Sequence, residues 1–160
     1  YSSSAASDVY KRQGLAVACD IRLCEDKSRF AIPAAKLGLG YGYEGIRRLA
    51  NLVGPAMVKE IFFTARQFSA GEAQEMGLVN RMLPPHMLVP YVDDYAKRIS
   101  ENAPMTMESV KAIVQAIQDD ESARDLDALD AMVKACFASQ DYIEGRRAFM
   151  EKRKPNFTGS

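Results

Sequence analysis

The sequence predicts an α/β protein in which short strands and helices alternate at the start and helices alone form the end. Ile21–Cys24 alternates apolar and polar residues, and Arg29–Ile32 is strand-like before Pro33. From residue 88 onward, apolar residues recur at the spacing of amphipathic helices. The length of 160 residues suits one domain with a sizeable core of its own.

Glycine and proline residues mark the expected ends of the elements in the middle of the chain. Gly54 ends one helix, and Pro55 fits the first turn of the next. Ser69 and Glu72 have the spacing of a capping box, which opens a short helix. The elements expected here are helices over Gly45–Val53 and Ala56–Ala65, a short helix that Gly77 closes, and a strand over Leu78–Leu83.

The second half of the chain is expected to be helical throughout. The predicted helix over Ala123–Ala138 has a wide apolar face, which another surface is expected to cover. The members of this face are Leu126, Leu129, Met132, Val133 and Phe137. The other expected helices cover Leu88–Ser100, Pro104–Ile117 and about Asp141–Lys152.

Composition excludes several classes of function. The 21 basic and 21 acidic residues balance, which argues against a nucleic-acid surface, and no apolar run approaches the roughly 18 residues of a membrane span. Three cysteines without a C-x-x-C pair predict buried thiols in a reducing, cytoplasmic protein. A single histidine, His86, excludes a multi-histidine metal site, and we expect no metal. His86 itself is interpreted as an ordinary loop residue.

Gly40–Gly45 formally matches the dinucleotide-binding pattern G-x-G-x-x-G, but its surroundings do not fit that function. The pattern requires a buried strand before it and an acidic residue about 20 positions later. Pro33 interrupts the preceding run, and Arg66 stands where the acid is expected. Tyr41 and Tyr43 would also crowd a pyrophosphate. We therefore do not expect a dinucleotide here.

Two charged segments have both a structural and a functional interpretation. In the structural interpretation, Glu44 interacts with the positive N-terminal end of the helix that follows and pairs with an arginine three or four residues later. In the functional interpretation, it acts as a catalytic acid/base, with Tyr41 or Tyr43 as a supporting donor. Lys152–Lys154 can complement the C-terminus of the last helix or contact a phosphate.

Several spaced motifs together resemble the enoyl-CoA hydratase/isomerase (crotonase) family. They are Gly14-Leu-Ala-Val-Ala-Cys-Asp-Ile-Arg22, Ser28-Arg-Phe30, Pro33, Lys36-Leu-Gly38, Gly42, Arg48-Leu49, Gly54, Ser69 to Val79, and Glu144-Gly145 to Arg153. The resemblance covers essentially all of residues 14–157. It implies the C-terminal part of a spiral of ββα units over 14–85, followed by oligomerisation helices over 86–160, in a homotrimer or a hexamer.

The resemblance also implies an acyl-CoA substrate whose thioester carbonyl is polarised by two backbone N–H groups, with no cofactor besides the coenzyme A of the substrate. Those donors are expected upstream of Gly14, so we expect the chain as given to be inactive. The family's two glutamates fall at Gly14 and Ala34, and a third acidic position falls at Gly42. Glu44 is the nearest acid, and we expect it to be buried and to act alone on the α-carbon.

Further expectations concern the two ends of the chain. Lys152 aligns with a family lysine that reaches the coenzyme A phosphates of a neighbouring subunit, and Phe137 is the second candidate for substrate binding. Residues 1–13 look like a translated sequencing adaptor rather than native sequence. The functions left open are an enzyme that works through an enolate, a non-catalytic acyl-CoA-binding or assembly subunit, and nucleic-acid binding, which the balanced charge disfavours.

Overall fold

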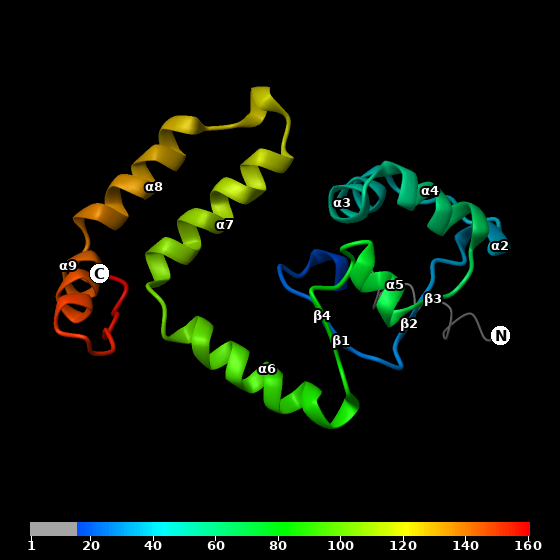
Figure 1. The fold of residues 1–160 in the computed structure, drawn as a ribbon. Helices are drawn as coiled ribbons and strands as arrows, with labels where there is room; N and C mark the ends of the chain where they lie inside the picture. Colours follow the sequence, from blue (N-terminus) through cyan, green and yellow to red (C-terminus); the bar gives the residue numbers. More distant parts are fainter. Residues whose placement is uncertain (1–15) are drawn as a thin grey trace. The chain divides into compact units, whose positions relative to one another are not determined.

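The computed structural model describes residues 16–160, which form two compact units (Figure 1). The first unit ends at Val92 and the second comprises Asp93–Ser160, so the division falls inside helix α6, Pro85–Ser100. The expected order of a mixed first part and a helical second part is confirmed. The segment interpreted as an adaptor and Gly14 lie outside the described residues.

Two pairs of short strands hold the first unit together. β1 (Leu23–Glu25) is parallel to β4 (Arg81–Leu83), and β2 (Arg29–Phe30) is antiparallel to β3 (Phe68–Ser69). The strands are shorter than expected, and β3 was not predicted, because two residues carry no periodicity.

Hydrogen bonds between Arg22 and Asn80, just before β1 and β4, hold these two distant strands together. The Arg22 N–H donates to Oδ1 of Asn80 at 2.8 Å, and the Asn80 N–H donates back to the Arg22 carbonyl at 2.8 Å. Nε of the buried Arg22 side chain also donates to the Leu78 carbonyl at 2.6 Å. These bonds satisfy a buried cation with backbone oxygens and set the start of the parallel pair.

Helices complete the core in the described part of the first unit. The large core side chains are Leu49, Ile61 and Phe68, each at most 4% exposed. Pro55 lies in the first turn of its helix, as predicted, while the short helix at Ala34 was not predicted. The helices are α2 (Ala34–Leu37), α3 (Tyr43–Val53), α4 (Pro55–Thr64) and α5 (Ala70–Glu75).

The predicted capping box at the start of α5 is confirmed and extends to an arginine. The Ser69 hydroxyl accepts from the Glu72 N–H at 3.3 Å, and the Glu72 carboxylate accepts from the Ser69 N–H at 2.8 Å. Arg66 donates to Glu72 at 2.8 Å and to Glu60 at 3.1 Å, with its guanidinium 3.7 Å from the centre of the Phe68 ring. One guanidinium thus links α4, β3 and α5.

Helices form the second unit, and the chain enters it within helix α6. α7 (Pro104–Gln118) packs against α8 (Leu126–Ala138), which contacts α9 (Gln140–Met150). α8 begins later than expected because the Asp125 side chain caps it by accepting from the Ala128 N–H at 2.9 Å, after a short 3-10 turn over Glu121–Ala123. No helix within residues 16–160 has the length and apolar character needed to cross a bilayer.

Some sequence expectations for individual side chains were wrong. His86 lies exposed in the first turns of α6 rather than in a loop. Cys24 is buried, which raises the pKa of its thiol, but Cys136 is only half-buried and Cys19 is exposed. The absence of a C-x-x-C pair therefore did not settle which of the thiols are buried.

We predict that Glu72→Gln lowers stability at neutral pH and loses its effect in acid. Hydrogen bonds from the Ser69 backbone, Arg66 and the Ser69 hydroxyl lower the pKa of Glu72 from 4.5 to about 2. A lowered folded-state pKa gives stability that is complete above about pH 4.5 and is lost as the pH falls towards 2. Thermal unfolding from pH 7 to pH 2 should therefore show the two melting temperatures converging.

Glu75→Gln, on an exposed position of the same helix, is the matched control for this experiment and should not change the pH dependence. A difference between wild type and Glu72→Gln that persists unchanged at pH 2 would contradict the assignment of the effect to the ionised carboxylate.

Candidate functional site

The loop before α3 holds one of the two candidate tyrosines in place. The Tyr41 ring contacts Phe62 of α4 edge-on, with ring centres 4.9 Å apart. A Cβ on Gly45 would lie 2.8 Å from Cε1 of Tyr41, so only glycine leaves room for the ring in this position. Tyr41 is half-buried as a result.

Glu44 does not have the buried environment that the sequence suggested. Its side chain is 62% exposed and pairs with Arg47 at 3.1 Å, in the first turn of α3. Tyr43 is 75% exposed. The reason is that α3 begins at Tyr43, which points the first-turn residues away from the core face marked by Leu49. The expectation of burial was therefore wrong for this chain, while the pairing with an arginine three residues later is present.

An apolar hollow of about 280 Å³ opens in the first unit, and the predicted site residues do not line it. Its wall consists of core side chains and the residues that lead into β1, and Arg22 is its charged member. The wall includes Val17, Cys24, Phe30, Phe68, Met76 and Val79. Neither of the two tyrosines nor Glu44 is part of it, so the structure separates the candidate acid/base from this hollow.

Two positions at which the resemblance places acids carry no ionisable group. Ala34 is 4% exposed and begins α2, and Gly42 caps the N-terminus of α3. Gly14 lies outside the described residues. Glu44, in the first turn of α3, is therefore the acid nearest to Gly42 along the sequence.

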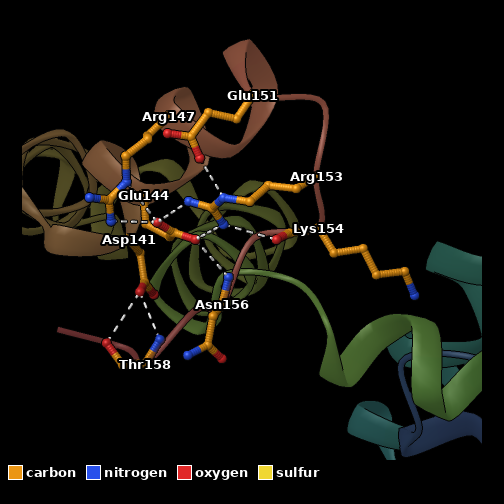
Figure 2. Close-up of polar contacts among 8 residues, drawn as sticks. All are labelled: Asp141, Glu144, Arg147, Glu151, Arg153, Lys154, Asn156 and Thr158. Carbon is orange, nitrogen blue, oxygen red and sulfur yellow. Dashed lines mark hydrogen bonds and ion pairs between the residues drawn. The ribbon is translucent and has the colours of Figure 1, made fainter.

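The C-terminal segment folds back along α9 and is held there by Asp141. The carboxylate of Asp141, in a residue that is 3% exposed, accepts from the backbone N–H groups of Thr158 at 2.7 Å and Gly159 at 2.9 Å. The N–H of Gln140 donates to the Ser160 carbonyl at 2.7 Å. A buried carboxylate is thus satisfied by the chain end that it anchors (Figure 2).

Glu144, one turn further along α9, is the centre of a second set of contacts. Its carboxylate accepts from Arg153 at 2.6 and 3.0 Å, from Arg147 at 2.8 Å and from the Asn156 N–H at 3.0 Å (Figure 2). Its side chain is only 13% exposed. Arg153, Arg147 and the Asn156 backbone hold the pKa of Glu144 well below its usual range, so it is ionised at neutral pH.

Lys152 occupies a left-handed position where helix ends usually have glycine. Its φ is +53°, its N–H donates to the Phe149 carbonyl at 3.3 Å, and the Arg153 N–H donates to the Ala148 carbonyl at 3.0 Å. This is the Schellman pattern with a lysine in place of glycine. The Lys152 side chain is exposed.

Phe137, the second candidate for substrate binding, lies near the end of α8 and is 62% exposed. Its ring contacts Tyr142 edge-on, with ring centres 5.3 Å apart. The predicted apolar face of α8 thus leaves Phe137 and Leu126 largely open in the chain by itself.

Comparison with known proteins shows the family to which the chain belongs. Residues 13–160 match the enoyl-CoA hydratase/isomerase family, and the chain belongs to it. It is 40% identical over 145 residues to a crotonyl-CoA hydratase of Syntrophomonas wolfei, covering 89% of this chain and 55% of that protein. It is 37% identical to a short-chain-enoyl-CoA hydratase of Clostridioides difficile, covering 84% of this chain and 87% of that protein.

Solved structures agree in fold. An enoyl-CoA hydratase/carnithine racemase from Magnetospirillum magneticum has a TM-score of 0.83 at 32% identity, covering 92% of this chain and 55% of that one. An enoyl-CoA hydratase subunit from Geobacillus kaustophilus has a TM-score of 0.82 at 34% identity, covering 92% and 58%. The crotonase-like fold is confirmed, and the chain spans a little over half the length of these two structures and of the Syntrophomonas relative.

The carboxylates Asp141 and Glu144 are the polar residues whose importance was missed. The one signal in the sequence was the spacing of Glu144 and Arg147, which allows an ion pair on a helix. Their bonds to residues 153–159 depend on how the chain reverses after α9, and no periodicity encodes that reversal.

We predict that Lys152→Gly raises thermal stability slightly. Glycine removes a left-handed cost of about 1–2 kcal/mol but adds about 0.4–1 kcal/mol of freedom to the unfolded chain, which leaves a net gain of about 0–1.6 kcal/mol. Denaturant unfolding should show this gain in the free energy of unfolding. Lys154 does not have a positive φ, so Lys154→Gly is the control and should show no gain. A clear loss of stability in Lys152→Gly would contradict the assigned turn.

Proposed function

We propose that the complete protein is an acyl-CoA thioester lyase or isomerase that works through an enolate. By the complete protein we mean these residues together with the rest of the length that its relatives have. The observation that carries the proposal is the family match over residues 13–160, with relatives named as enoyl-CoA hydratases. Hydration, double-bond migration and decarboxylation all fit an enolate held by preset hydrogen-bond donors. The chain by itself is expected to be inactive, because those donors are expected upstream of it.

Glu44 is the proposed acid/base on the α-carbon, and Tyr41 or Tyr43 is the proposed supporting donor. Two observations support this role: Glu44 lies in the first turn of α3, directly after Tyr43 and three residues after Tyr41, and its carboxylate reaches solvent. Arg47 at 3.1 Å keeps the carboxylate oriented. An acyl group bound beside the first turn of α3 would bring its α-carbon to a carboxylate that can take up a proton and return it.

Substrate binding is proposed to involve the second unit as well. Lys152 presents an exposed ammonium group for a coenzyme A phosphate, and Phe137 presents an open ring for apolar contact. We further propose a homotrimer or hexamer in the cytoplasm, with no cofactor besides the coenzyme A of the substrate. The exposed side chains Leu126 and Phe137 on α8 support assembly, because a second subunit that covers them removes their apolar surface from water.

A non-catalytic acyl-CoA-binding or assembly subunit is the alternative function. The observation in its favour is that the acid positions implied by the resemblance hold a buried alanine at position 34 and a glycine at position 42. Incubation of the complete protein with a panel of enoyl-CoA thioesters separates the two. A product with the mass of added water, or an isomer resolved by chromatography, supports the enzyme, whereas binding of the thioesters without any product supports the alternative.

We predict that Glu44→Gln in the complete protein lowers kcat by at least about 100-fold, because positioned acid/base groups contribute about 10²- to 10⁴-fold. Glu60→Gln is the matched control: Glu60 also pairs with an arginine at 3.1 Å on a helix of the same unit. Its kcat should stay within about twofold of wild type. Unchanged turnover in Glu44→Gln would leave Glu44 with a structural role only.

A further inference from the structure

The three cations after α9 differ in what surrounds them. Arg153 donates to Glu144 through two nitrogens and to Glu151 at 2.6 Å. Lys154 pairs with Glu101 at 3.3 Å. For Lys152, no carboxylate of residues 16–160 lies within ion-pair distance. In this tripeptide the ammonium of Lys152 is therefore the charge that remains available to an anion from outside.

Glu144 fixes the backbone that follows Lys152 in the chain. Its two oxygens receive the guanidinium of Arg153, the next residue, in a two-pronged contact at 2.6 and 3.0 Å. The same carboxylate receives the Asn156 N–H at 3.0 Å, four residues beyond Lys152. The left-handed conformation of Lys152 at φ +53° is thus held by α9 before it and by Glu144 after it.

We propose that Glu144 is a positioning residue for phosphate binding by Lys152: it fixes the turn that presents the Lys152 ammonium and engages Arg153, so that the arginine does not compete for the phosphate. This inference rests on the proposed function, because it assigns to Glu144 the orientation of the phosphate contact proposed there. A left-handed lysine would otherwise relax toward ordinary helical or extended backbone and move its side chain.

The geometry distinguishes positioning from a role in stability alone. Asp141 already anchors residues 158 and 159 through two backbone N–H bonds. The chain end therefore keeps an attachment when Glu144 loses its charge, and the local effect falls on residues 152–156. Loss of Glu144 should accordingly weaken recognition of the phosphates and leave the rate of the chemical step unaltered.

The test compares the KM and kcat of the complete protein for an acyl-CoA thioester and for the matching acyl-pantetheine thioester, which has no phosphate. Glu144→Gln should raise the KM for the acyl-CoA roughly three- to tenfold, with kcat within about twofold, and should leave the KM for the pantetheine thioester unchanged. Lys152→Gln should give the same pattern. Asp130→Asn, which removes a carboxylate from an exposed pair with Lys134 on α8, is the control and should change neither constant.

The double variant Glu144→Gln with Lys152→Gln is the decisive comparison. If Glu144 acts through Lys152, the second substitution adds nothing to the KM of Lys152→Gln. Arg153→Lys keeps the charge but loses the two-pronged contact, so it should show a smaller rise in KM that also disappears without Lys152, and it carries the test if Glu144→Gln does not fold.

Any one of four results would overturn the inference. A KM effect of Glu144→Gln that persists in the absence of Lys152, or that equally affects the pantetheine thioester, would assign Glu144 a structural role only. An unchanged KM in Glu144→Gln alongside a raised KM in Lys152→Gln would overturn positioning and leave the phosphate contact intact. An unchanged KM in Lys152→Gln would overturn the phosphate contact itself, and with it the role of Glu144.

Discussion

In both units, the direction in which the chain leaves a helix depends on one kind of contact. A residue with a positive φ ends the helix, an arginine directly follows it, and a carboxylate holds that arginine. Ala65 and Lys152 have φ values of +45° and +53°, which are costly for residues other than glycine. The arginine after each of them donates to a carboxylate, Glu72 at 2.8 Å or Glu144 at 2.6 Å. Each carboxylate also accepts a backbone N–H, so one side chain fixes the direction of the chain on both sides of the contact.

These two reversals serve different parts of the proposed activity. In the first unit the arginine lies over Phe68 and fixes the entry to α5, whose buried alanines belong to the same core as Leu49 of α3, the helix that carries Glu44 in its first turn. In the second unit the contact between Arg153 and Glu144 fixes the turn after α9, and this turn positions Lys152. The side chains of the proposed acid/base group and of the proposed phosphate contact are both exposed, Glu44 in the first turn of α3 and Lys152 after the end of α9.

Local signals in the sequence were sufficient for much of the fold and for little of the site. Ser69 and Glu72 predicted a capping box, because both partners of that motif lie within one turn. The exposure of Glu44 was missed, because it depends on α3 beginning at Tyr43 and not at Gly45. The role of Glu144 was missed because its partners Arg153 and Asn156 meet it only after the chain turns back.

The most direct test of the proposed enolate chemistry is deuterium uptake by a saturated acyl-CoA in D2O, measured by mass spectrometry with the complete protein. We expect uptake at the α-carbon by the wild-type protein and strongly reduced uptake by Glu44→Gln, since proton exchange there requires both an enolate and a base. Binding of the thioester by the wild-type protein without any gain in mass would contradict it.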